Sequence, residues 1–210
     1  MRELILKMTI SVDGFVSDLD GRNGWMFGSD QEAKAWSVGM IRGAGLHVMG
    51  SRSFLAMANY WQTSTDQFAP PMNRIPKAVF SRQGPAILKN VGMAAALEAA
   101  HAREGAGQPA QLQSGAESWA QAYVASGDLA EEVARLKAEA GRPIIAYGGV
   151  RFARSLIALR LVDRLALLVA PVALGRGLPL FSELAAPMSL TLESSTAFPG
   201  GMVAQIYRPA

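Results

Sequence analysis

Residues 143–161 read PIIAYGGVRFARSLIALRL. An apolar run of strand length ends in Gly148 and Gly149, and apolar residues at helical spacing begin directly behind them. This order predicts a buried strand that turns at once into a helix. Two glycines at such a junction suit a tight turn, and they also suit a ligand that must approach the main chain where a Cβ atom would block it. The stretch by itself leaves both interpretations open.

Two other strand-to-helix junctions repeat this chemistry. They are Gly50, Ser51 and Arg52 in VMGSRSF, and Ser81 and Arg82 in AVFSR. Free backbone amides at strand ends and helix N-termini favour phosphate, and the planar guanidinium group of arginine donates two hydrogen bonds to it at once. Each junction alone is a weak signal. Three in one chain predict a dinucleotide stretched across one edge of a sheet.

Two common nucleotide-binding motifs are missing from the chain. The first apolar strand is followed by Asp13 and Gly14 rather than by G-x-G-x-x-G, and no G-x-x-x-x-G-K-[ST] run occurs. These absences disfavour a standard dinucleotide-binding fold and a nucleotide-hydrolysing motor.

Hydrophobic periodicity and turn residues divide the chain into alternating strands and helices. We expect strands at 2–12, 46–49, 76–80, 143–147, 164–172, 188–197 and 202–207, and a further strand that begins the segment 119–128. We expect helices from about 30 to 42, directly after Gly50, and at about 92–104, 129–139 and 150–161. The alternation predicts an α/β fold with a mixed, mostly parallel sheet flanked by helices, and the turn FPGG predicts an antiparallel C-terminal hairpin.

Composition narrows the class of protein. Half of the 210 residues are hydrophobic, which suits one domain over 1–210. We expect this domain to carry an extended, flexible insertion at about 84–118. The alternatives for this insertion are a lid extension, a dimer contact and a disordered segment. There is no cysteine, and His47 and His101 lack the spacing of zinc ligands, so we expect no metal site. The net charge of +3 is scattered, which favours small anionic ligands over nucleic acid. No run of about 18 apolar residues and no signal peptide is present, so we expect no membrane partner and a cytoplasmic location.

Longer stretches resemble a known family. They are LKMTISVDGFVSD, VMGSRSF, PKAVFSR and the whole of residues 126–181. In this order they resemble the dihydrofolate-reductase-like superfamily, and within it the branch named for the C-terminal reductase domain of the bifunctional riboflavin-biosynthesis deaminase/reductase. The resemblance implies a dihydrofolate-reductase-like sheet, with NADPH bound at the carboxyl ends of its strands.

The resemblance also implies roles for the residues at the junctions. Gly50, Ser51 and Arg52 would face the adenosine-side phosphates, Ser81 and Arg82 the 2′-phosphate region, and Gly148 and Gly149 the pyrophosphate, with Val150 and Arg151 opening the helix behind them. Ile10, Ser11, Asp13 and Gly14 would line the nicotinamide and substrate side. The loop 15–28 resembles the mobile loop that covers the nicotinamide, with Trp25 as a lid residue. Residues that would recognise a ribityl phosphate cannot be placed.

Three carboxylates are candidates for catalysis: Asp13, Asp30 and Glu32. Each has a structural alternative. Asp13 precedes Gly14 in a turn sequence, and Asp30 and Glu32 lie in the first turn of a helix, where Ser29 and Glu32 form a capping-box pattern. The sequence does not separate the two roles.

The favoured function is an NADPH-dependent reductase that transfers a hydride to a small conjugated heterocycle, of the pterin or riboflavin-pathway pyrimidine type. The alternative is a non-catalytic module that binds a nucleotide or other ligand on the same fold. The apolar C-terminal strands and LALLVAPVAL (165–174) predict a homodimer.

Overall fold

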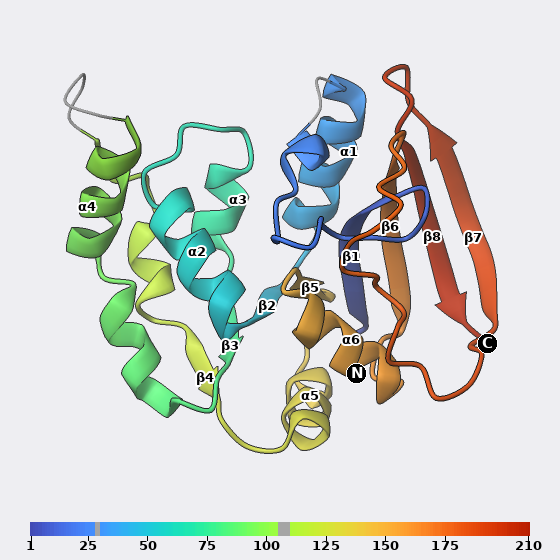
Figure 1. The fold of residues 1–210 in the computed structure, drawn as a ribbon. Helices are drawn as coiled ribbons and strands as arrows, with labels where there is room; N and C mark the ends of the chain where they lie inside the picture. Colours follow the sequence, from blue (N-terminus) through green and yellow to red (C-terminus); the bar gives the residue numbers. More distant parts are fainter. Residues whose placement is uncertain (28–29, 105–109) are drawn as a thin grey trace.

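The computed structural model describes residues 1–27, 30–104 and 110–210, and its centre is a single sheet. The strand order is β4-β3-β2-β5-β1-β6-β8-β7, with β4 and β7 at the two ends (Figure 1). The strands are β1 (Leu4–Ser11), β2 (Leu46–Gly50), β3 (Lys77–Phe80), β4 (Tyr123–Ala125), β5 (Ile144–Tyr147), β6 (Arg164–Ala170), β7 (Leu190–Ala197) and β8 (Val203–Pro209). From β4 to β6 all neighbours are parallel, and β8 pairs antiparallel with both β6 and β7. The expected mixed, mostly parallel sheet is confirmed.

Helices cover both faces of this sheet. The helices are α1 (Gln31–Arg42), α2 (Ser51–Trp61), α3 (Ala69–Arg74), α4 (Met93–Glu104), α5 (Leu129–Ala138) and α6 (Val150–Ala158). Buried residues of α5 and α6 pack with Leu4, Leu6 and Met8 of β1 in one core cluster. Buried residues of α1, α2 and α3 pack with Ile5 in a second cluster on the opposite face. The alternation of β1 side chains between two cores explains why this strand is almost wholly buried.

The segment 84–118 forms the crossover between β3 and β4. It contains the 3₁₀ helices η2 (Gly84–Asn90) and η4 (Ala116–Trp119) on either side of α4. Ile87 and Val91 are fully buried, and the side-chain amide of Gln62, the C-cap residue of α2, donates to the carbonyl of Val91 at 3.0 Å. The segment is thus packed on α2 rather than appended to the domain, although residues 105–109 of the expected flexible loop lie outside the described part.

A closed ring of four charged side chains joins β1, β6, β7 and β8. Arg164 pairs with Glu3 at 2.9 Å and with Glu193 at 2.8 Å, and Arg208 pairs with the same carboxylates at 3.3 and 2.9 Å. These residues belong to, or directly precede, β1, β6, β7 and β8. The ring lies at the amino end of β1 and β6.

Two local predictions need correction. The expected strand at the start of 119–128 begins only at Tyr123, because Trp119 belongs to η4 and is fully buried beneath Phe54, with ring centroids 5.6 Å apart. The N-cap of α1 is Asp30, whose carboxylate accepts from the amide of Ala33 at 3.0 Å. Ser29, the expected cap, lies outside the described residues.

Within the described residues, no helix is long and apolar enough to cross a membrane.

Candidate active site

The three junctions that carry the predicted glycine, serine and arginine residues meet at one edge of the sheet. Because β2, β3 and β5 run parallel, their carboxyl ends lie at the same edge, which we call the carboxyl edge. A Cβ atom added to Gly50 would lie 3.1 Å from Cβ of Phe152 in α6, and the ring of Phe152 is 5.0 Å from that of Phe80 at the end of β3. The junctions after β2, β3 and β5 are therefore in contact around one aromatic ring.

The glycine pair adopts a backbone that other residues rarely take. Gly148 has a φ of 25° and Gly149 a φ of 75°. A Cβ atom on Gly149 would lie 2.8 Å from the hydroxyl oxygen of Ser53 in α2, so both the backbone and the space require glycine there. Gly149 is the N-cap of α6 and Gly50 that of α2, and neither helix has a side-chain cap. Two helix N-termini thus keep their amides and positive dipole ends available beside one another.

Basic side chains surround this pair of helix N-termini. The guanidinium groups of Arg52, Arg82 and Arg151 are exposed, and within the part of the chain that the structure describes they have no hydrogen-bond or ion-pair partner. Ser81 is buried, and its hydroxyl accepts from the amide of Gln83 at 3.2 Å, as in a turn. The arrangement can hold two or more phosphate groups. The assignment of each group to one residue stays a prediction.

On the substrate side of the carboxyl edge, hydrogen bonds to Asp13 join the loop after β1 to the loop after β6. The carboxylate of Asp13 accepts from the hydroxyl of Ser11 at 2.6 Å, and from the amides of Leu174 at 3.1 Å and Gly175 at 2.7 Å. These bonds, the one from Ser11 first, hold the pKa of Asp13 below its ordinary value. Asp13 therefore positions the loop after β6. A direct catalytic role for it stays a prediction.

The loop after β1 is partly tied down by further contacts with the loop after β6. Phe15 forms a bridge with Pro179, and the amide of Val16 donates to the carbonyl of Leu178 at 2.9 Å. The amide of Leu180 donates to Gly14 at 3.0 Å. The start of the loop that was expected to be a mobile lid is therefore paired with residues 178–180. The 3₁₀ helix η1 (Gly24–Phe27), which carries Trp25, is not part of this pairing. Gly28, the last residue of the predicted lid, lies outside the described residues.

Ile10 and Ser11 end the same strand but face opposite ways. The side chain of Ile10 packs in the core cluster beneath α6, so only its backbone is at the edge. Ser11 is buried, and its hydroxyl accepts from the amide of Phe15 at 3.0 Å. Both residues support the edge rather than offer a free group to a ligand.

Two predicted residues come together in a small cavity. Trp25 and Asp30 line a space of about 210 Å³ together with Ala170, Pro171, Val172, Gly200 and Met202. One oxygen of Asp30 accepts from the amide of Gly200 at 2.7 Å, which joins the first turn of α1 to the tip of the β7–β8 hairpin. Glu32 is exposed and does not line this cavity. Of the two carboxylates on α1, only Asp30 lies beside the candidate substrate space.

Lys7 is a candidate that the sequence reasoning missed. It lies in the middle of β1, pairs with Tyr147 of β5, and its ammonium lies 5.8 Å from the ring centre of Trp36 in α1. Burial lowers the pKa of Lys7 to about 8, and within the described residues it has no carboxylate partner. A lysine in the centre of the apolar strand LILKMTIS was the available signal. A half-buried amine that is not neutralised can hold a proton or bind an oxygen of a substrate.

Ser53 was also missed. Its hydroxyl oxygen is the nearest side-chain atom to both glycines, at 3.6 Å from a Cβ built on Gly148 and 2.8 Å from one on Gly149. Only the packing of α2 against the β5–α6 junction reveals this position, because Ser53 is nearly a hundred residues away in sequence. It is placed to donate a hydrogen bond to a phosphate at the glycine pair.

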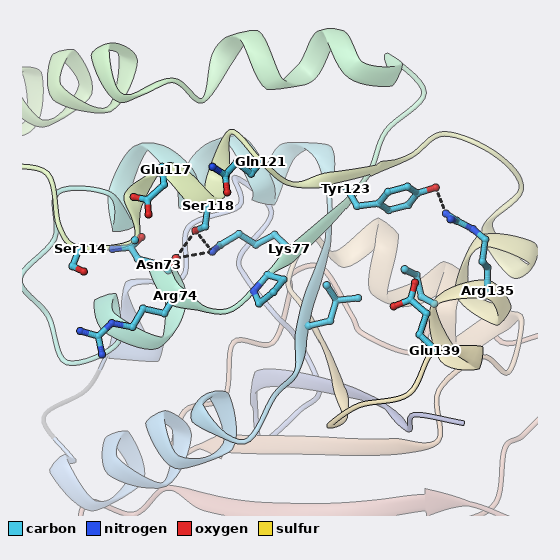
Figure 2. Close-up of a pocket in the computed structure, with 14 residues that line it drawn as sticks. Asn73, Arg74, Lys77, Ser114, Glu117, Ser118, Gln121, Tyr123, Arg135 and Glu139 are labelled. Carbon is cyan, nitrogen blue, oxygen red and sulfur yellow. Dashed lines mark hydrogen bonds between the residues drawn. The ribbon is translucent and has the colours of Figure 1, made fainter.

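A larger cavity lies at the opposite edge of the sheet, where β2, β3 and β4 begin, and it is not the candidate active site (Figure 2). Its volume is about 590 Å³, and Figure 2 shows Lys77 at its centre, bonded to Ser118 and Asn73. The ammonium also donates to the carbonyl of Ile75 at 2.7 Å, so its three donors are all used. Burial lowers the pKa of Lys77 to about 7, with Glu117 opposing the shift. Lys77 ties β3 to α3 and η4, which is a structural role.

His47 lies in the core, and the described residues form no cluster of metal-ligating side chains. His47 is fully buried, its ring packs edge-on against Tyr147 at 5.1 Å, and burial lowers its pKa to about 3. It is a core residue. In the described ranges, no group of three His, Cys, Asp or Glu side chains could hold a metal ion.

The sheet order, the crossovers and the ligand edge define a dihydrofolate-reductase-like α/β domain. The model of the RibD C-terminal domain family matches residues 2–204, so the chain belongs to this family, whose members are reductases. The resemblance that the sequence showed is confirmed.

Individual relatives agree with this assignment. The uncharacterized protein YyaP of Bacillus subtilis (strain 168) is 36% identical over 87 residues, which cover 41% of this chain and 46% of that relative, so the match spans less than half of either protein. A protein assigned to riboflavin biosynthesis from Shewanella sp. PV-4 has the same fold, with a TM-score of 0.68, 19% identity, and coverage of 100% of this chain and 99% of that one.

A longer enzyme has the same domain. It is the diaminohydroxyphosphoribosylaminopyrimidine deaminase/5-amino-6-(5-phosphoribosylamino)uracil reductase of Thermotoga maritima, with a TM-score of 0.66 and 15% identity. The match covers 100% of this chain and 57% of that one, so the chain spans little more than half of that enzyme.

Proposed function

We propose that this chain is an NADPH-dependent reductase that transfers a hydride to a small conjugated heterocycle. The observation that carries the proposal is the meeting of two helix N-termini without side-chain caps, at Gly50 and Gly149, with exposed arginines beside them that have no partner among the described residues. A phosphate-rich ligand would satisfy both the amides and the guanidinium groups. Membership of a reductase family makes a nicotinamide dinucleotide the ligand that fits best.

The residues present fit this cofactor. The glycine pair carries no side chain over its main chain, and the hydroxyl of Ser53 lies against Gly149, 2.8 Å from where a Cβ atom would stand, so it is placed to donate to a pyrophosphate held by these amides. Arg82, after β3, is the candidate for the 2′-phosphate that distinguishes NADPH from NADH, because β3 lies farthest along the edge among the three junctions. The nicotinamide side would then extend toward the end of β1.

The bound cofactor supplies the hydride, so the protein must orient the substrate, exclude water and place a proton. Lys7 is the half-buried group best suited to hold that proton at its Nζ atom, because its pKa of about 8 leaves it protonated near neutral pH and able to release the proton. Trp25 would exclude water from the 210 Å³ cavity, and Asp30 would contact a substrate N–H group there. Asp13 acts through the loop that it holds and is a positioning residue.

Titration of the purified protein with NADPH and NADH, followed by tryptophan fluorescence and melting temperature, tests the cofactor. We expect NADPH to bind more tightly, and no response to either dinucleotide would reject the proposal. NADPH oxidation across a panel of pterins, pyrimidines and flavins then tests turnover. Binding of NADPH without oxidation by any of them would favour the alternative, a non-catalytic binding module.

Lys7→Met tests the proton-holding role, with Lys89→Met, an exposed lysine, as its matched control. We expect kcat to fall about a hundredfold in Lys7→Met while NADPH affinity is retained, since general acid catalysis contributes about that much. An unchanged kcat would remove Lys7 from the mechanism and leave the cofactor assignment intact.

We also propose a homodimer, on narrower grounds than the sequence suggested. The apolar run 165–170 is β6, an inner strand whose leucines are mostly buried inside the domain, so it adds no outer surface. What remains is β7, which is exposed along most of its length and carries Leu192 at 50% exposure. Light scattering at micromolar concentration tests this proposal, and a monomer would reject it.

A further inference from the structure

The start of the loop after β6 is fixed to the loop after β1 at two points. The amide of Gly175 donates to the carboxylate of Asp13 at 2.7 Å, and the amide of Leu178 donates to the carbonyl of Ser17 at 2.9 Å. Arg176 lies between these two points. Its main chain is therefore held in place at the substrate side of the carboxyl edge.

The residues on either side of Arg176 are glycines that the backbone requires. Gly175 has a φ of 69°, a conformation that other residues rarely adopt. A Cβ atom on Gly177 would overlap the carbonyl oxygen of Ser17, because the two loops approach each other closely there. Since both neighbours restrict the path of the chain, the guanidinium group of Arg176 is carried by a backbone that loses little freedom when a ligand binds.

A second arginine at this loop has structural partners. Arg154 in α6 donates from Nε and Nη2 to the carbonyl of Pro179 at 2.8 and 2.6 Å, and its Nη1 atom lies 3.6 Å from Glu183. Its side chain is only 14% exposed. The fold thus uses the guanidinium group of Arg154 to join the loop to α6.

Arg176 has no such contacts among the described residues. Its side chain is exposed, and its guanidinium group has no hydrogen-bond or ion-pair partner there. The carboxylate of Asp13, which the same loop contacts, accepts instead from the hydroxyl of Ser11 and from the amides of Leu174 and Gly175. Arg176 is thus available to a ligand, and its planar guanidinium group suits a phosphate, to which it can donate two bonds at once.

Arg176 lies within reach of the small cavity that Trp25 and Asp30 line. Val172 also lines this cavity, and Arg176 follows it by four residues on the same loop, so their Cα atoms are at most about 14 Å apart. The junctions proposed for the cofactor phosphates lie on the other side of β1, after β2, β3 and β5. A substrate whose ring occupies the cavity can therefore place a phosphate on its side chain beside Arg176, apart from the phosphates of the cofactor.

From this placement we infer that Arg176 is a specificity residue of the substrate site, and that its guanidinium group binds a phosphate on the side chain of the heterocycle. The inference rests on the proposed reductase function and deepens it, because it assigns the recognition of a charged substituent to one residue. Arg176 contributes to binding, whereas the proton transfer proposed for Lys7 does not depend on it. A phosphate of the cofactor would be bound by the same chemistry, so the experiment must separate the two sources.

The test compares two substrates that differ only in the phosphate. They are 5-amino-6-(5-phosphoribosylamino)uracil, the compound in the name of the Thermotoga maritima enzyme, and the same compound without its phosphate. NADPH oxidation is measured with both for the wild-type chain, for Arg176→Met and for Arg74→Met, whose arginine is exposed at the amino edge and, among the described residues, also without a partner.

We expect Arg176→Met to raise KM for the phosphorylated compound at least about tenfold and to leave kcat nearly unchanged, since charge-assisted hydrogen bonds to phosphate are strong. KM for the unphosphorylated compound should stay within about twofold, and Arg74→Met should change neither. Equal changes for the two compounds in Arg176→Met, or no change, would overturn the inference and leave the reductase function standing. Oxidation of NADPH by the wild-type chain with unphosphorylated compounds only would do the same. If NADPH is oxidised with no pterin, pyrimidine or flavin, the reductase function is rejected and the inference falls with it.

Titration with NADPH, followed by tryptophan fluorescence, separates the two sources of phosphate. We expect the affinity of Arg176→Met for NADPH to stay within about twofold of that of the wild-type chain. A fall of about tenfold would assign Arg176 to the cofactor and overturn the inference. Arg176→Lys should restore part of the affinity for the phosphorylated substrate, because lysine binds phosphate as a point charge without the bidentate geometry of arginine.

Discussion

Arginines at the two edges of the sheet differ in whether they have ion-pair partners. At the amino edge, where the parallel strands begin, Arg164 and Arg208 share Glu3 and Glu193, and Arg2 pairs with Glu139 at 2.5 Å. At the carboxyl edge, Arg52, Arg82 and Arg151 are exposed and, within the described ranges, have no partner. Arg2, Arg164 and Arg208 join elements of the fold at the amino edge, whereas the three arginines at the carboxyl edge have no partner among the described residues. The proposed site lies at the carboxyl edge, although the larger cavity lies at the amino edge.

The largest effect is expected at the glycine pair. Gly149→Ala places a methyl group at a φ of 75° and 2.8 Å from the hydroxyl of Ser53, so we expect NADPH affinity to fall about a hundredfold, measured by fluorescence titration. Gly141→Ala is the control from the amino edge, because Gly141 also has a positive φ and its Cβ would meet only the flexible side chain of Arg2 at 3.2 Å. It should lower the melting temperature and leave NADPH affinity unchanged. Equal losses of affinity in both variants would mean that backbone strain, not the site, causes the effect.

The next effect concerns stability alone. Arg2 is buried, and its guanidinium group donates to the carbonyl of Leu136 at 2.8 Å as well as to Glu139. Arg2→Met leaves that carbonyl unpaired, so we expect the free energy of unfolding to fall by about 1–3 kcal/mol, measured by urea denaturation. NADPH affinity should not change. A loss of affinity would show that the two edges are not independent.

Arg82→Met is the converse experiment. Arg82 is exposed and, among the described residues, without a partner, so we expect unfolding in urea to be unchanged while NADPH affinity falls about tenfold. NADH affinity should stay the same, because NADH lacks the 2′-phosphate. Arg52→Met distinguishes the two arginines, because Arg52 is assigned to the adenosine-side phosphates and Arg82 to the 2′-phosphate. Equal weakening of NADPH and NADH by Arg82→Met would reject its assignment to the 2′-phosphate.

The smallest expected effect is a pH dependence of the free energy of unfolding, caused by lysines whose pKa is lowered by burial. Burial lowers the pKa of Lys77 from 10.5 to about 7, so between these values the unfolded chain binds more protons than the folded one. Stability should therefore rise as the pH increases from about 7 toward 10.5, and Lys7, with a pKa of about 8, adds to the rise. Lys77→Met should flatten this slope, measured by urea denaturation at three pH values, while Lys89→Met should not. An unchanged slope in Lys77→Met would assign the dependence to other groups.

The sequence predicted those parts of the fold that depend on neighbouring residues. The glycine pair and the hairpin turn are local signals, and the structure confirms the elements that they delimit. The cap at Asp30 was assigned one residue away, because adjacent Ser, Asp and Glu residues offer equivalent caps until the backbone is known. The buried 3₁₀ turn around Trp119 was taken for a strand, because a short apolar run has the same composition in both.

The parts that could not be predicted depend on distant partners. Ser53 becomes part of the site only because α2 packs against the glycine pair, and Lys7 only because β1 lies between β5 and β6 under Trp36. The loop after β1 was expected to be a free lid, yet Asp13 and Phe15 join it to residues about 160 positions later. Such pairings carry no local pattern, so the sequence predicted that the junctions after β2, β3 and β5 share one edge, whereas the contacts on the substrate side of that edge could not be predicted.

The position of the first strand has a consequence for how the chain reaches its native state. β1 lies between β5 and β6, so the partners of residues 4–11 are not synthesised until the ribosome has passed residue 144. Until then the N-terminal strand is an apolar segment with two unpaired edges, which is the kind of segment that chaperones bind. High sequence separation of contacts slows folding, and a fragment that ends before residue 170 lacks the strand that completes the centre of the sheet. Expression of shortened chains should therefore yield aggregates rather than a smaller folded unit.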